Sequence, residues 1–115
     1  MNNYQCFYLC NAAGGGFVLP AEIIRCEGFN NQTLIHLHGK PPILISKTMK
    51  WCESVLPPHH FARIHQRHII NIDFISAVYL SDNAYVKMIN CKLLPVARAR
   101  KKHFYFLLHE RFVIF

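Results

Sequence analysis

The fold of this chain is decided by the stretch Phe61-Ala62-Arg63-Ile64-His65-Gln66-Arg67-His68-Ile69-Ile70-Asn71, in which polar and basic residues are interleaved with apolar ones. The interleaving has a period of two residues, which is typical of a half-buried strand. One face of such a strand carries Phe61, Arg63, His65 and Arg67, and the other carries Ala62, Ile64 and Gln66. We therefore predict a strand that leaves the core, an exposed loop that presents His65, Gln66 and Arg67, and a second segment that re-enters the core.

The composition limits the class of protein. The chain has 115 residues, of which 52% are hydrophobic, so we expect one folded domain over residues 1–115. Thirteen Lys and Arg residues against six Asp and Glu give a formal charge of +7, which suits a phosphate backbone or an anionic lipid surface. No apolar run approaches the roughly 20 residues of a membrane helix. Because the start also lacks the basic region of a secretory signal, we expect a cytoplasmic protein without a membrane partner.

The cysteines and histidines give no pattern of a metal or disulfide site. The five cysteines are an odd number and contain no Cys-x-x-Cys pair, so we predict buried, reduced thiols without a disulfide or zinc. His36 and His38 share a strand face, but no third ligand stands nearby in the sequence, and we interpret them as polar residues on a solvated face. No His or Cys has the spacing of a nucleophile with its base. We therefore predict neither a cofactor nor an enzyme.

Short apolar runs separated by turn residues recur along the rest of the chain. They predict strands near residues 7–10, 17–19, 23–27, 33–38, 43–45, 77–80, 84–88 and 92–96, a spacing that indicates an all-β core. One helix is predicted from an N-cap at Ser46 to the Pro57-Pro58 pair, with Met49, Cys52, Val55 and Leu56 on its apolar face. A second helix is predicted after Ala97, with Phe104, Leu107 and Leu108 on one face.

Two further segments carry polar side chains that could bind nucleic acid. The loop Asn30-Asn31-Gln32 is rich in amides, which suit tight turns and which also match the edge of adenine in a major groove; both interpretations stay open. The run Ala97-Arg98-Ala99-Arg100-Lys101-Lys102-His103 places four positive charges at the start of the second helix. The helix dipole disfavours cations there, which suggests that an external anion compensates them.

The order and spacing of these segments resemble the LytTR-type DNA-binding domain of bacterial transcription regulators. The resemblance covers about residues 6–108, and it rests on the following pieces: 23–27, 30–32, the helix from Ser46, Phe61-Ala62-Arg63-Ile64-His65, Ile69-Ile70-Asn71 and Leu94-Pro95-Val96-Ala97-Arg98. It implies a mainly β fold of small stacked antiparallel sheets with one or two short helices. It also implies binding of duplex DNA through loops that enter successive major grooves, and a cytoplasmic transcription regulator or response-regulator output domain.

The resemblance implies a set of DNA-binding residues in three loops. Some candidate residues match the family's contact positions, and others lie beside the matching loops. They are Asn31, Gln32, Arg63, His65, Gln66, Arg67, Arg98, Arg100 and Lys101. Arginine fits guanine, the amides fit adenine, and the surrounding Lys and Arg hold phosphates. The chain departs from the family pattern at Gln66-Arg67 and Ala97, which should alter sequence preference, and at Gln32 and Cys91, where a structural effect is expected. Asn71 is interpreted as structural, with its amide bonded to backbone.

The partners expected are double-stranded DNA at promoter sites with repeated half-sites, a second copy of the chain on that DNA, and a regulatory protein. We expect no receiver domain in the chain, which fits either a stand-alone regulator or an excised domain. The alternative function is a basic β module that binds a protein partner without reading DNA. The apolar end Phe112-Val113-Ile114-Phe115 either docks on the core or offers a sticky edge to another chain.

Overall fold

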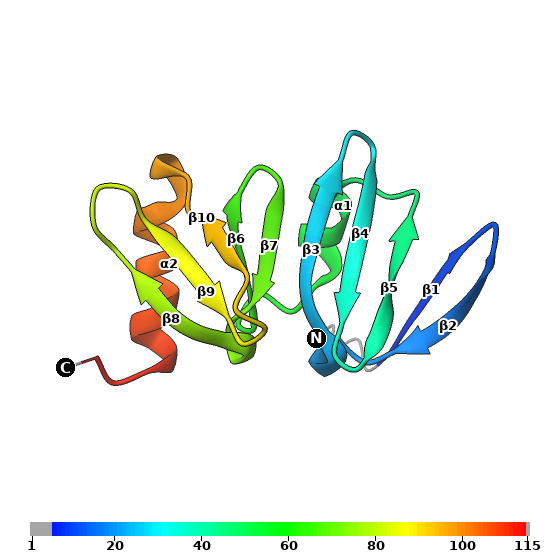
Figure 1. The fold of residues 1–115 in the computed structure, drawn as a ribbon, viewed down its shortest axis with the longest axis horizontal. Coiled ribbons are helices and arrows are strands. Elements are labelled where there is room, and N and C mark those ends of the chain that lie inside the picture. Colours follow the sequence, from blue (N-terminus) through cyan, green and yellow to red (C-terminus); the bar gives the residue numbers. More distant parts are fainter. Residues whose placement is uncertain (1–5, 115) are drawn as a thin grey trace.

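The computed structural model describes residues 6–114. Its strands form three antiparallel sheets that follow one another along the longest dimension of a domain measuring 44 × 30 × 25 Å (Figure 1). The strands are β1 (Phe7–Asn11), β2 (Gly14–Val18), β3 (Ile23–Phe29), β4 (Gln32–Leu37), β5 (Lys40–Ile45), β6 (Phe61–His65), β7 (His68–Asn71), β8 (Ile75–Tyr79), β9 (Tyr85–Met88) and β10 (Leu93–Pro95). The helices are α1 (Met49–Val55) and α2 (Arg98–Arg111), and the 3-10 turns are η1 (Pro20–Glu22) and η2 (Ile72–Phe74).

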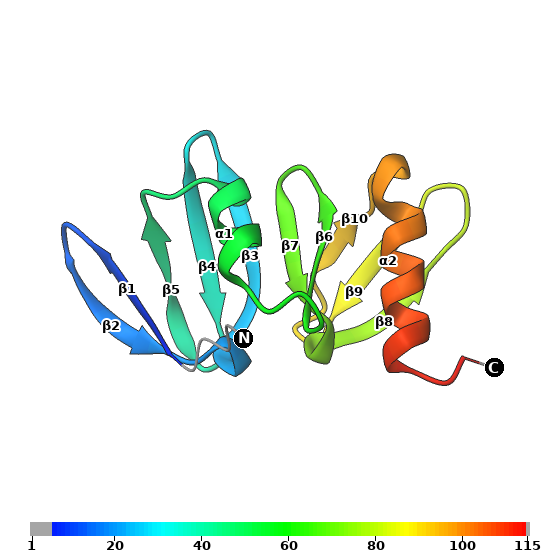
Figure 2. The same ribbon diagram turned by 180° about the vertical axis from the view of Figure 1, so that it is seen from behind.

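The five-stranded sheet is the centre of the fold. Its order is β5-β4-β3-β7-β6, and it lies between the β1-β2 hairpin and the three-stranded sheet β10-β9-β8 (Figure 1). Figure 2 shows α1 in front of the five-stranded sheet and α2 in front of the three-stranded one. The mainly β architecture of small antiparallel sheets with two helices confirms the predicted fold class.

The central stretch 61–71 contributes to two separate hydrophobic cores. Phe61 and Ile69 belong to the core beneath α1, whereas Ile64 and Ile70 belong to the core beneath α2. The alternation has this effect because successive side chains of a strand point to opposite faces. Strands β6 and β7 therefore join the two halves of the domain, and the predicted anchors are confirmed as buried.

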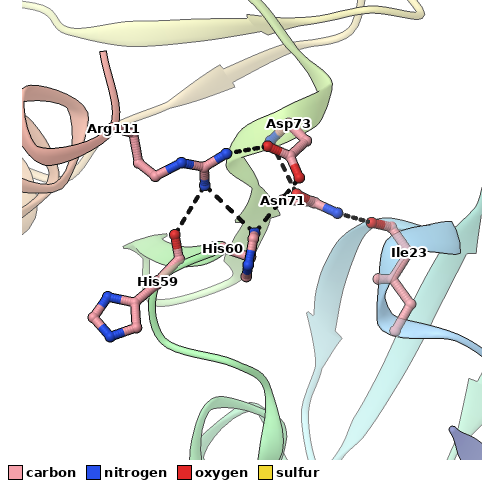
Figure 3. A network of polar contacts seen from close by, with 6 residues as sticks. All are labelled: Ile23, His59, His60, Asn71, Asp73 and Arg111. Atoms are coloured by element: carbon pink, nitrogen blue, oxygen red, sulfur yellow. Dashed lines mark hydrogen bonds and ion pairs between the residues drawn. The ribbon is translucent and has the colours of Figure 1, made fainter. Parts of the chain in front are cut away.

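A polar network at the end of β7 attaches the C-terminus of α2 to both halves (Figure 3). Asn71 is buried, and its Nδ2 donates to the Ile23 carbonyl at 2.9 Å while its Oδ1 accepts from the Asp73 amide at 2.9 Å. Asp73 forms an ion pair with Arg111, which also donates to the His59 carbonyl at 2.9 Å. Asn71 is therefore structural, as predicted.

Several predicted boundaries are wrong. Helix α1 begins at Met49 and its N-cap is Thr48, whose hydroxyl accepts from the Trp51 amide at 3.1 Å, so Ser46 is not the cap. Strand β5 begins at Lys40 and includes both prolines that were expected to form a turn. Proline is tolerated there because β5 is an edge strand of its sheet.

The cysteine prediction is correct for only two of the five residues. Cys26 and Cys52 are buried, whereas Cys6, Cys10 and Cys91 are exposed, and all five are free thiols. Cys10 follows buried Leu9 in β1 and so points to the opposite, exposed face of the hairpin. Cys91 lies in the turn between β9 and β10 with φ = 68°, a conformation that favours glycine.

The apolar residues 112–114 do not dock on either core. Phe112, Val113 and Ile114 are exposed, Val113 to 80%, while Phe115 lies outside the described residues. The expectation of a sticky edge for another chain stays a prediction. None of the helices within residues 6–114 is long and apolar enough to cross a membrane, and those residues contain no His, Cys, Asp and Glu cluster that could hold a metal ion.

Candidate nucleic-acid interface

Three loops that are separate in the sequence lie at the same edge of the domain (Figures 1 and 2). They are the β3-β4 turn at 30–31, the β6-β7 turn at 66–67 and the β10-α2 connection at 96–97. The first two meet because β3 pairs antiparallel with β7, which brings the end of β3 beside the start of β7. The third is attached to β6 by a hydrogen bond from the Ala97 amide to the Ile64 carbonyl at 2.7 Å.

The first two loops and the start of α1 enclose a groove of about 550 Å³. Five of the predicted site residues line it: Asn31, Arg63, His65, Gln66 and Arg67. Gln32 is exposed at the start of β4 but is not part of this lining. The structure thus places the amide-rich loop beside the central loop, which the sequence alone left open.

The two asparagines of the β3-β4 turn have different roles, one in forming the turn and one in lining the groove. Asn30 has φ = 54°, a left-handed conformation that asparagine tolerates better than most residues, so it forms the turn itself. Asn31 is exposed and lines the groove. Gly28, just before the turn, permits close approach of α1, since a Cβ atom there would lie 2.7 Å from Met49 Cγ.

Arg63 and Arg67, both predicted to face DNA, are held by contacts within the protein. The side chain of Arg63 is only 13% exposed; its Nη1 lies 3.1 Å from Glu53 Oε1 and its Nη2 donates to the Gln66 carbonyl at 2.7 Å. Arg67 donates from Nε to the Gly28 carbonyl at 3.2 Å and stacks over the Phe29 ring at 5.7 Å. These contacts fix the β6-β7 turn against α1 and the β3-β4 turn. Gln66, at the tip between them, has an exposed side chain.

His65 is oriented by its neighbours in the loop. Its Nδ1 accepts a hydrogen bond from the Arg67 amide at 3.1 Å, which leaves Nε2 to carry the ring proton in the neutral form. Its ring lies 5.3 Å from that of His68. Burial, together with the positive charges of His65 and Arg25, lowers the pKa of His68 from 6.5 to about 4. His68 is therefore neutral near pH 7, and its buried Nδ1 has no hydrogen-bond partner among residues 6–114.

The lowered pKa of His68 predicts a loss of stability in acid. The unfolded chain takes up a proton at the ordinary pKa of 6.5, but the folded protein does so only near 4. The free energy of unfolding should therefore fall as the pH decreases from about 6.5 to 4, by at most about 1.4 kcal/mol per pH unit for this group. Urea denaturation across this range should show a shallower fall for His68→Gln than for the wild type. An unchanged profile would assign the acid sensitivity to another group, such as His36, whose pKa is also lowered by burial.

The start of α2 carries the basic residues of the third loop on two of its sides. Arg98, Lys101 and Lys102 line a hollow of about 380 Å³ with Leu80 and Tyr105. Arg100 instead lines a cavity of about 100 Å³ that Glu53 and Arg63 also line. The N-cap, Ala97, provides no side-chain hydrogen bond, and the first turn contains no acid, so the helix terminus stays electropositive.

Sequence reasoning missed the residues before and at the start of α1. Thr48 and Lys50 line the same groove as Gln66, and Lys47 lies beside them with its ammonium 5.1 Å from the Trp51 ring centre. The buried hydroxyl of Thr33 donates to the Lys47 carbonyl at 2.7 Å, which fixes this connection next to the β3-β4 turn. The sequence did not mark these two lysines as site residues, because it does not show which loops they accompany.

A basic edge of three loops on a mainly β domain is the arrangement of a nucleic-acid-binding protein. The family model described as the LytTr DNA-binding domain matches residues 16–109, and the chain therefore belongs to the LytTR family of DNA-binding domains. Its partner is DNA and its role lies in transcription regulation.

A solved structure supports this assignment at the level of the fold. The chain superposes with a TM-score of 0.80 on a LytTr DNA-binding domain from Bacillus cereus, assigned to a methyl-accepting/DNA response regulator. The two are 22% identical, and the similarity covers 90% of this chain and 96% of the other. A comparison with curated proteins gave no significant match. Strand β1 and the residues after 109 lie outside the family match.

Proposed function

We propose that this chain is a single cytoplasmic domain that recognises specific sequences of double-stranded DNA and regulates transcription by reading successive major grooves through its three loops. The observation that carries the proposal is the common edge formed by the loops at 30–31, 66–67 and 96–97 (Figure 1). Backbone hydrogen bonds connect the three loops and the strands beside them. The Gly28 amide donates to the Arg67 carbonyl at 3.0 Å, and the Ala97 amide donates to the Ile64 carbonyl at 2.7 Å. A rigid edge of this kind can present several side chains to one duplex at fixed spacing.

The side chains on this edge divide into base readers and phosphate contacts. Exposed amides at Asn31, Gln32 and Gln66 suit adenine, and the exposed guanidinium of Arg98 suits guanine. His65, with its proton on Nε2, would donate to a base acceptor. The residues assigned to phosphates are Lys47, Lys50, Arg100, Lys101 and Lys102. Arg63 and Arg67 are assigned to holding the central loop, because both are already bonded within the protein.

The distribution of charge supports a polyanionic ligand. Four of the acids, Glu22, Glu27, Glu53 and Asp73, already form ion pairs with basic residues inside the described part of the chain. In contrast, Lys50, Arg98 and Lys102 have no acid within ion-pair distance among residues 6–114. This leaves uncompensated positive charge on the edge that carries the loops, as phosphate binding requires.

The proposal predicts salt-dependent and sequence-dependent binding to duplex DNA. Fluorescence anisotropy should give micromolar or tighter affinity at low salt, and the logarithm of the affinity should fall linearly with the logarithm of the salt concentration because several condensed counterions are released. Selection from a random duplex pool should enrich a defined sequence, and two half-sites one helical turn apart would indicate a homodimer. No binding at low salt, or binding without any enriched sequence, would contradict the proposal.

The alternative of a protein-binding module is favoured by one observation. Phe106 is 58% exposed on α2, and Val113 and Ile114 are exposed beyond the end of the helix. A regulatory protein that binds at the C-terminal end of α2 would leave the loop edge free, since that end of the helix lies away from the three loops (Figure 2). Duplex binding that persists in a Phe106→Ala, Val113→Ser variant would separate this surface from the DNA-binding edge.

A further inference from the structure

Glu53 is an acid in an unfavourable place for a DNA-binding protein. It lies on α1, its side chain is 47% exposed, and it pairs with Arg63, which lines the groove that we assign to DNA. A negative charge beside a phosphate backbone weakens binding through repulsion. A useful role for Glu53 must therefore come from its contacts within the protein.

Those contacts lead directly to the tip of the central loop. Glu53 Oε1 lies 3.1 Å from Arg63 Nη1, and the other terminal nitrogen of the same guanidinium donates to the Gln66 carbonyl at 2.7 Å. The Arg63 side chain is 13% exposed, and its Nε is buried without a hydrogen-bond partner in the described part of the chain. The planar guanidinium thus bridges a helix carboxylate and a loop carbonyl, and its orientation determines where the backbone of Gln66 lies.

We propose that Glu53 is a positioning residue that acts through Arg63 to hold the Gln66 tip in its reading conformation. This inference rests on the proposed function, because it assigns Glu53 to sequence discrimination. Without the carboxylate, the Arg63 side chain is free to turn from Gln66 toward a DNA phosphate. The loop then loses its bridge to α1, and the Gln66 amide samples several directions.

The positioning role and simple charge repulsion predict different results for the same substitution. Glu53→Gln removes one negative charge, so affinity for a random duplex should stay equal or increase. Loss of positioning should at the same time lower the affinity for the selected site. The specificity ratio, which is the affinity for the selected site divided by that for the random duplex, should fall roughly three- to tenfold. Glu53→Asp keeps the charge but shortens the reach to Arg63, and it should lower the ratio without raising random binding.

The matched control is Glu110→Gln, which removes one negative charge near the far end of α2, where Glu110 is exposed. It should leave the specificity ratio unchanged. The double variant Glu53→Gln, Arg63→Lys should discriminate no worse than Arg63→Lys alone, because both changes break the same bridge. Circular dichroism and urea denaturation of each 115-residue variant establish that it is folded before binding is measured.

The outcomes separate this inference from the proposed function. If the wild type shows no preference for any selected sequence, sequence-specific reading itself is wrong. If the wild type discriminates and Glu53→Gln keeps the wild-type ratio, the positioning role is overturned while the proposed function stands. An equal loss of affinity for both duplexes also overturns it, since a positioning residue must affect the selected site more strongly.

Discussion

Phe104→Ala is expected to lower the free energy of unfolding by about 3–5 kcal/mol, the largest effect of any substitution considered for this protein. Phe104 has no exposed surface and inserts from α2 into the core that also contains Ile64 and Met88. Alanine would leave a cavity in that core, because the sheets on either side can close only partly around it. Urea denaturation of both proteins would measure the change in free energy.

The matched control is Phe106→Ala, two positions along the same helix. Phe106 is 58% exposed, so its truncation should change the free energy of unfolding by no more than about 0.5 kcal/mol. If Phe104→Ala were equally mild, α2 would not be held by this core. Because α2 begins directly after the third loop, a partly detached helix should also weaken DNA binding in the Phe104 variant.

The second large effect is expected at two residues that we propose read bases. Arg98→Ala and Gln66→Ala should each reduce binding to the selected sequence by about 1–3 kcal/mol and relax the preference at one defined base pair. The physical reason is the loss of a side chain that pairs with a base edge, where another base cannot offer the same donors and acceptors. Competition anisotropy with every single-base variant of the selected site would locate the position that each residue reads.

Lys101→Ala provides the contrasting case. Its ammonium donates one hydrogen to the Ser81 carbonyl at 2.8 Å and keeps two further donors, which we propose contact phosphate on the same helix turn as Arg98. The substitution should weaken all sequences to a similar degree and reduce the salt slope by about 1. Identical behaviour of the Arg98, Gln66 and Lys101 variants would show that the division into readers and phosphate contacts is wrong.

Much of the fold could be predicted from local patterns. The alternation in 61–71, the turn residues between short apolar runs and the face of Phe104, Leu107 and Leu108 correspond to observed strands and to the buried side of α2. The two errors have different causes. Ser46 and Thr48 both have a hydroxyl suited to a helix cap, so the residue type did not choose between them. Pro41 lies in a strand that has a neighbour on one side only, which is not visible within a few residues of sequence.

The location of the candidate site could be predicted from the sequence, but the role of each side chain within it could not. Residue types and the family resemblance identified all three loops, and the structure brings them to one edge (Figure 1). It also shows that both terminal nitrogens of Arg63 are engaged by Glu53 and Gln66, whereas Arg67 is exposed and is held through its Nε alone. A sequence indicates that an arginine is present beside a loop. Whether it points outward depends on which acceptors the fold brings within about 3 Å.

By itself the sequence determined the mainly β class, the positive charge and the strand that carries His65 and Gln66 to an exposed turn, because these follow from period, composition and turn chemistry. Only the tertiary structure decided how that turn is supported. The antiparallel pairing of β3 with β7 sets the amide loop beside it, and α1 supplies Glu53 to hold Arg63. Both depend on packing between segments far apart in the chain, where a displacement of one ångström decides whether a hydrogen bond forms.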